Sequence, residues 1–147
     1  FMDNYQTEVL KTLASDETYE QFIDADRFYQ DTFGFVVAAA ALERHKKTMA
    51  YGKNLPKFPS INPVQTDNVD VLHAKLGIAG EAGEVFDATT RDEVKNEVGD
   101  LLWYIAVLLN AYGLDFPEVM QANIDKLKKK YGTGKFTREE ALNPRVR

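Results

Sequence analysis

Apolar residues recur along this chain at intervals of three and four, which places them on one face of an α-helix. No stretch shows the strict two-residue alternation of a half-buried strand followed by a tight-turn pair. The pattern therefore predicts an all-α protein. The expected helices span residues 5–13, 17–31, 35–49, 68–87, 90–112 and 118–131, with one last turn near 137–140.

The two helices in the middle of the second half have clear start and stop signals. Thr90 followed by Glu93 is a capping box, and Gly113 is suited to end a helix in the left-handed conformation. Because so few residues separate helix 68–87 from helix 90–112, the two must form a tight antiparallel hairpin. We expect this hairpin to lie at the centre of a helical bundle.

The first half of the chain has weaker signals. A run of alanines at 38–41 permits another helix to pack closely against helix 35–49. Residues 52–67 contain three prolines, which exclude a regular helix and predict an extended connection. The length favours one domain over residues 1–147.

Two pairs of carboxylates lie on the predicted hairpin. Each pair is separated by three residues and so projects from one helix face. At a rise of about 1.5 Å per residue, counted from the turn at 89–90, the two pairs lie at matching heights. Four carboxylates can therefore converge between the two helices: Glu81 and Glu84 on the first, and Glu97 and Asp100 on the second.

A cluster of this kind favours a divalent cation. Partly buried carboxylates repel one another or take up protons unless cations lie among them. The chain has no cysteine and only two histidines, so the available ligands are hard oxygens, which select Mg²⁺ or Mn²⁺. The alternative is four solvated charges. Four glycines lie near these carboxylates: Gly77, Gly80, Gly83 and Gly99. Each weakens a helix by about 1 kcal/mol relative to alanine. Their presence therefore favours close approach to the backbone by a facing helix or a ligand.

Other sites for the same chemistry do not fit. A ferritin-like di-iron centre needs Glu three residues before a histidine, and neither His45 nor His73 has one. The chain also lacks the glycine-rich phosphate loop that ends in Gly-Lys-Ser/Thr. A metal site built from carboxylates is the remaining hypothesis.

Composition and charge set the remaining bounds. The net charge is −5, which argues against a general nucleic-acid binder, yet residues 126–147 hold eight Lys and Arg against two Asp and Glu. This basic end is either a solvated face or a set of cations for phosphate. Phe1 precedes Met2, where we expect the natural start. Without cysteine, a signal peptide or a membrane-length apolar run, a soluble cytoplasmic protein is expected.

The carboxylate segments resemble a known family. Residues 80–85 (GEAGEV) and 97–104 (EVGDLLWY) closely resemble the E-x-x-E and E-x-x-D signature of the MazG-like all-α nucleoside triphosphate pyrophosphohydrolases. Residues 123–131 (NIDKLKKKY), followed by Gly-Lys-Phe at 134–136, are similar to the family's segment after the hairpin. The resemblance covers residues 72 to about 142, and relative to it residues 16–67 are expected to be an N-terminal elaboration or insertion.

The resemblance implies hydrolysis of a nucleoside or deoxynucleoside triphosphate to the monophosphate and pyrophosphate. It implies that Glu81, Glu84, Glu97 and Asp100 hold Mg²⁺, and that Glu81 or Glu84 also acts as the base for water. Tyr104 shares a stripe with Glu97 and Asp100, so it either stacks on the nucleobase or is a core residue. Three residues at helical spacing are candidates to contact phosphate oxygens: Asn123, Lys126 and Lys130.

Several alternatives stay open at this point. A helical module could bind a nucleotide or a partner protein without catalysis, and a pyrophosphohydrolase could be dedicated to dUTP or to phosphoribosyl-ATP. House-cleaning of the nucleotide pool is one role that fits. We also expect a homodimer or a higher homo-oligomer, because residues 101–109 are apolar on every side of their helix.

Overall fold

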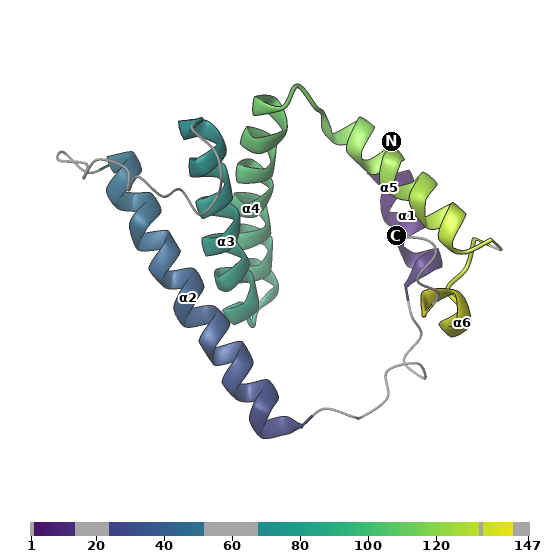
Figure 1. Ribbon diagram of the computed structural model, residues 1–147, viewed down its shortest axis with the longest axis horizontal. Coiled ribbons are helices and arrows are strands. Elements are labelled where there is room, and N and C mark those ends of the chain that lie inside the picture. The colour runs from purple at the N-terminus through teal and green to yellow at the C-terminus, as the bar shows by residue number, and fades with distance from the viewer. Residues whose placement is uncertain (1, 14–23, 52–67, 133, 143–147) are drawn as a thin grey trace. The chain divides into compact units, whose positions relative to one another are not determined.

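The computed structural model describes residues 2–13, 24–51, 68–132 and 134–142. Within these residues all regular secondary structure is helical, so the all-α prediction is confirmed. None of these helices has both the length and the apolar character needed to cross a membrane. The helices, shown in Figure 1, are α1 (Met2–Thr12), α2 (Ala25–Tyr51), α3 (Val69–Asp87), α4 (Arg91–Ala111), α5 (Phe116–Lys130) and α6 (Arg138–Ala141).

The chain divides into two compact units. One unit, Asp24–Gly113, contains α2, α3 and α4, and we call it the three-helix unit. The other consists of Phe1–Ile23 and Leu114–Arg147 and contains α1, α5 and α6; we call it the terminal unit. The expectation of a single domain stays a prediction.

Helix α3 lies between α2 and α4 and packs against both (Figure 1). Its glycines permit this close packing because a side chain at each would overlap a neighbouring helix. A Cβ atom at Gly77 would meet the ring of Tyr104 on α4, and one at Gly83 would meet the Cβ atom of Ala39 on α2. Ala39 of the predicted alanine run therefore packs against Gly83 between α2 and α3, and Gly77 permits the close approach of α4.

Caps fix both ends of the α3–α4 hairpin. The side chain of Asn68 accepts hydrogen bonds from the amides of Asp70 and Val71, which begins α3. The Thr90–Glu93 capping box begins α4, as predicted. Gly113 follows α4 with a φ of 67°, a conformation that other residues rarely adopt. The sequence signals for this hairpin are confirmed.

The prediction of two separate helices, 17–31 and 35–49, is wrong at the junction between them. Helix α2 runs without a break through Gly34. An internal glycine costs a helix only about 1 kcal/mol, and Gly34 does not adopt the left-handed conformation that ends one. The hydroxyl of Thr32 donates to the carbonyl of Phe28 at 2.9 Å, inside the helix. Residues 17–23 and the connection 52–67 lie outside the described residues.

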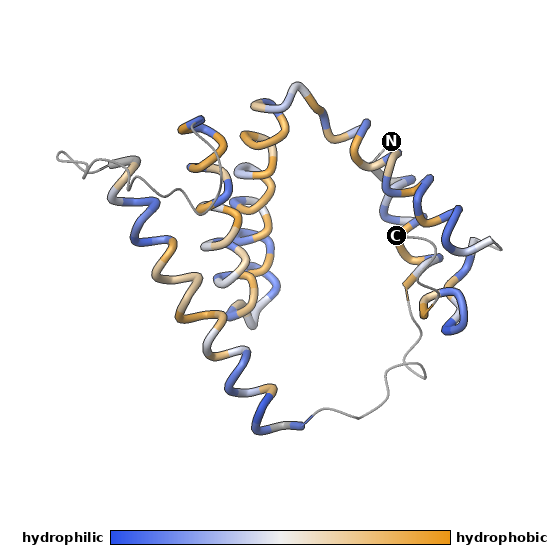
Figure 2. The backbone as a smooth tube through the Cα atoms, viewed as in Figure 1, coloured by the Kyte–Doolittle hydropathy of each residue, from blue (hydrophilic) through white to orange (hydrophobic). Residues whose placement is uncertain are grey.

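Apolar residues run along much of α4 (Figure 2), yet several of them are exposed. Tyr104 is its one buried residue, whereas Leu102 is 46% exposed and Trp103 is 55% exposed. Within the three-helix unit, α3 covers one side of α4. The apolar character around the whole circumference of α4 is thus not explained by the helices of its own unit.

The terminal unit is held together by contacts between α1 and α5. The hydroxyl of Tyr5 donates to Oδ1 of Asn123 at 3.3 Å, and Ile124 is buried. Tyr131, which caps α5, packs its ring against that of Phe136 with 5.7 Å between centroids. Thr137 then caps α6, as the sequence predicts.

Candidate functional site

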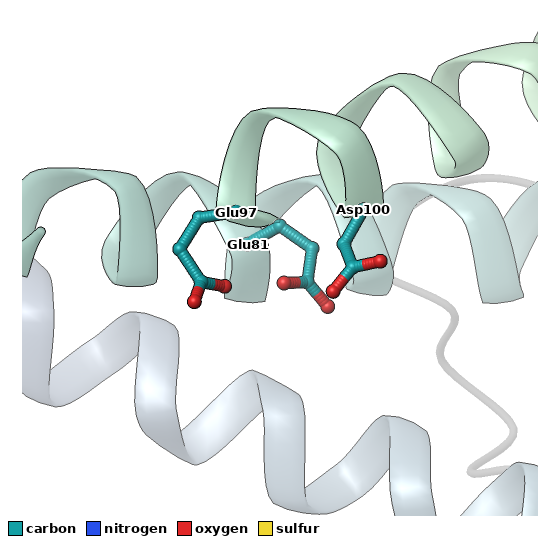
Figure 3. Close-up of side chains that lie close together, drawn as sticks. All are labelled: Glu81, Glu97 and Asp100. Carbon is teal, nitrogen blue, oxygen red and sulfur yellow. The ribbon is translucent and has the colours of Figure 1, made fainter. Parts of the chain in front are cut away.

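Three carboxylates converge on one side of the α3–α4 hairpin. Glu81 comes from α3, and Glu97 and Asp100 come from successive turns of α4. Each can offer one oxygen so that all three oxygens lie within 4.8 Å of one another. Figure 3 shows the three side chains pointing to the side of the hairpin on which α2 lies. We call these residues the carboxylate triad.

The triad runs from the interior to the surface. Glu81 is buried, Glu97 is partly exposed and Asp100 is exposed. Electrostatic interactions are strong on the buried side of such a group, where Glu81 lies. A ligand could reach the group from its exposed side, where Asp100 lies. The donor set consists of hard oxygens alone, which fits Mg²⁺ or Mn²⁺.

Glu84, the fourth predicted carboxylate, lies outside this group of three. Its residue is exposed, and its carboxyl group lies beside that of Glu97. Partial burial, followed by the charge of Glu97 and a hydrogen bond to it, raises the pKa of Glu84 above its usual value. Glu84 therefore lies next to the triad with a carboxyl group that is less acidic than an isolated one.

Helix α2 adds two charged residues that the sequence analysis did not find. Glu43 and Lys46 are both buried, and both face α3. Nζ of Lys46 lies 3.2 Å from Oε1 of Glu81 and 2.7 Å from Oε2 of Glu43. The sequence signal was the spacing of three between Glu43 and Lys46, directly after the alanine run, but nothing in the sequence placed α2 beside the hairpin.

The buried charges change one another's acidity. Burial raises the pKa of Glu81, although the hydrogen bond and charge of Lys46 oppose it, and the charges of Glu84 and Glu43 raise it further. Burial alone would lower the pKa of Lys46, but hydrogen bonds to Glu43, Tyr104 and Glu81 outweigh it, so the pKa of Lys46 rises. Lys46 is therefore a permanent cation beside the triad.

Tyr104 lies at the contact between α3 and α4. It is 7% exposed, and its ring packs against the ring of His73 with 5.6 Å between centroids. Its hydroxyl accepts a hydrogen bond of 2.7 Å from Lys46. The structure thus connects Tyr104 to the triad through Lys46, while stacking of Tyr104 on a nucleobase stays a prediction.

The candidate phosphate-binding residues belong to the terminal unit. Asn123 accepts a hydrogen bond from Tyr5, and Lys126 is exposed on the same helix, α5. Nζ of Lys130 lies 5.7 Å from the centre of the Tyr131 ring. The role of these three residues toward phosphate also stays a prediction.

Comparison with known proteins gives an independent observation. Residues 71–133 match the family model of the MazG nucleotide pyrophosphohydrolase domain. The Gene 37 protein of Mycobacterium phage L5 is 29% identical over an alignment of 83 positions, which covers 46% of this chain and 73% of the phage protein. No solved structure matches at a significant level. The resemblance found in the sequence is thus confirmed for residues 71–133, which include the triad and Glu84.

Proposed function

We propose that this protein is a metal-dependent nucleoside triphosphate pyrophosphohydrolase, which converts (d)NTP to (d)NMP and pyrophosphate. The observation that carries the proposal is the carboxylate triad, whose oxygens lie within 4.8 Å of one another inside the segment that matches the MazG nucleotide pyrophosphohydrolase domain. A polyphosphate is an anion and would not bind beside three carboxylates alone. A cation between the two resolves this conflict.

Glu81, Glu97 and Asp100 would hold Mg²⁺, or Mn²⁺, with Glu84 beside them. When bound, such an ion neutralises charge on the phosphates and makes water more acidic. The water oxygen would attack the α-phosphorus and the bond from that phosphorus to the bridging oxygen would break, so that the monophosphate keeps the water oxygen and pyrophosphate leaves with the bridging oxygen. Glu84 is the group we assign to accept the proton of that water, with Glu81 as the alternative. Its carboxyl group lies beside that of Glu97, next to the oxygens that would hold the ion.

The basic end of the chain would recognise the phosphates. Asn123, Lys126 and Lys130 share α5 and could contact phosphate oxygens, and Lys126 is exposed. Lysine supplies a point charge rather than the two-pronged contact of arginine, so it contributes charge more than geometry. Tyr104 would border the nucleobase. This arrangement is compatible with nucleotide-pool house-cleaning.

The working unit would be a homodimer or a higher homo-oligomer. Leu102 and Trp103 of α4 expose large apolar side chains, although the Trp103 ring also lies 6.3 Å from the ring of His73 on α3. Exposed apolar patches of this kind on a helix favour self-association, and two-fold symmetry is its commonest form. A partner copy of α4 is therefore the proposed cover.

The direct test is a screen of natural and modified nucleoside triphosphates with Mg²⁺, including dUTP and phosphoribosyl-ATP, with the products separated by chromatography. We expect equal amounts of monophosphate and pyrophosphate, and no product in excess chelator. Nucleotide binding without pyrophosphate would identify a non-enzymatic module instead. Turnover of dUTP alone, or of phosphoribosyl-ATP alone, would identify a dedicated enzyme.

A further inference from the structure

Lys46 is a buried cation that lies outside the segment matching the MazG domain. It belongs to α2, whereas the match begins at residue 71, and only 3% of Lys46 is exposed. Removing an ammonium group from water is costly unless hydrogen-bonding or oppositely charged groups surround it. The groups around Lys46 therefore indicate what it does.

Groups from three helices meet at Nζ of Lys46. It donates to the hydroxyl of Tyr104 at 2.7 Å and to Oε1 of Glu81 at 3.2 Å. It also pairs with Oε2 of Glu43 at 2.7 Å, on its own helix. The ring of Tyr104 lies close by, with 4.3 Å between its centroid and Nζ. Because an ammonium has three protons, these partners fix where it lies.

Glu81 is the point at which this network reaches the triad. The hydrogen bond from Lys46 uses Oε1 of Glu81, and a carboxylate carries a second oxygen. A group hydrogen-bonded to a metal ligand sets the orientation of that ligand, and losing it weakens metal binding by about 10- to 100-fold. Lys46 stands in this relation to Glu81.

We propose that Lys46 is a positioning residue for the metal site: it holds Glu81 so that the second carboxylate oxygen meets Glu97 and Asp100 around a divalent cation. This inference rests on the proposed function, which supplies the metal. It makes α2 a part of the site, although the matching segment does not contain α2. Lys46 acts through Glu81 and does not itself touch the cation.

The neighbouring residue, Lys47, provides a matched control. Nζ of Lys47 lies 3.2 Å from Oε1 of Glu43, so it shares a partner with Lys46. Its side chain is 61% exposed, and Lys46, not Lys47, is bonded to Glu81. Substituting either lysine removes one positive charge from α2, but of the two it is Lys46 that contacts a triad residue.

The test measures Mn²⁺ binding to the metal-free full chain, from the paramagnetic resonance signal of free Mn²⁺ and by calorimetry. We expect Lys46→Met to raise the dissociation constant about tenfold or more, and Lys47→Met to leave it within about twofold. Lys46→Arg keeps the charge and the donors and should bind more tightly than Lys46→Met. Circular dichroism shows whether each variant keeps its helices.

Each outcome separates the inference from the function on which it rests. If the unsubstituted chain does not bind Mn²⁺, the metal site itself is wrong. If it binds Mn²⁺ and Lys46→Met binds equally well or more tightly, Lys46 is only a neutralising charge and the inference is wrong. If Lys46→Met loses its helices, Tyr104→Phe decides, since it removes an acceptor of Lys46 without altering a carboxylate. Weaker binding supports the inference, and an unchanged constant overturns it.

Discussion

Helices α3 and α4 form one hairpin and are both rich in apolar residues, yet their surroundings differ. Helix α3 is covered on two sides, by α2 and α4, whereas α3 covers α4 on one side. The same difference separates the triad residues: Glu81 on α3 is buried, and Asp100 on α4 is exposed. A buried helix thus supplies the fixed part of the site, and a more open helix supplies the accessible part.

The glycines of the two helices follow this difference. Those of α3 lie against side chains of neighbouring helices: Gly77 against Tyr104, Gly80 against Glu43, and Gly83 against Ala39. Gly99 on α4 has no atom of a neighbouring element within 4 Å in the described part of the chain. A glycine in a helix therefore signals close packing on α3, whereas on α4 it marks a surface that a ligand or a second copy could approach.

The largest expected effect comes from neutralising a triad residue on each helix. Asp100→Asn and Glu81→Gln should each lower kcat more than about 100-fold, because a lost ligand costs at least as much as a lost supporting group. Asp100 is exposed, so Asp100→Asn should leave the free energy of unfolding nearly unchanged. Product chromatography and urea unfolding measure the two effects. Full turnover in either purified variant would remove that residue from the mechanism.

Local signals made much of the hairpin predictable. Asn68, the Thr90–Glu93 capping box and Gly113 act within a few residues of where they stand in the chain, so the helix ends follow from the sequence. The spacing of three within each carboxylate pair places the pairs on helix faces for the same reason.

The contribution of α2 was not predictable in this way. Lys46 and Glu81 are 35 residues apart, and residues 52–67, outside the described part of the chain, lie between them. No local sequence signal indicates that the alanines of α2 pack against the glycines of α3. The continuity of α2 through Gly34 contradicts the predicted break, because an internal glycine costs a helix only about 1 kcal/mol.

The second prediction concerns the open side of α4. Sedimentation equilibrium at micromolar concentration should give a mass that is a multiple of 16.6 kDa. Trp103→Glu should weaken association about tenfold or more, because a charge replaces an exposed aromatic side chain at the proposed contact. Lys95→Glu, on an exposed position of the same helix, is the control. A monomer with full activity would show that α4 is open in the working protein.

The third prediction compares glycines. Gly77→Ala should destabilise the protein by about 1–3 kcal/mol, because the added methyl group meets the buried ring of Tyr104. Gly99→Ala should stabilise it by up to about 1 kcal/mol, since alanine favours the helix and nothing described opposes it. Urea unfolding of both variants measures the difference. Destabilisation by Gly99→Ala would instead reveal a second copy packed against α4.

The smallest expected effect is the pH dependence of stability that Glu84 introduces. Glu84 lies on the buried helix α3, beside Glu97 of the more open helix α4. Its pKa is raised in the folded chain, so the ionised carboxylate lowers stability at neutral pH, and this cost disappears as the pH falls through the raised pKa.

Without metal, Glu84→Gln should therefore raise Tm at pH 7.5 and have less effect at pH 4. Added Mg²⁺ should reduce the benefit at pH 7.5, because a cation offsets the repulsion from Glu97, which after partial burial is the next cause of the raised pKa of Glu84. Thermal unfolding followed by circular dichroism measures all three conditions, with Glu118→Gln on α5 as the control. A Tm gain that is equal at both pH values would mean that Glu84 does not share the charge of the triad.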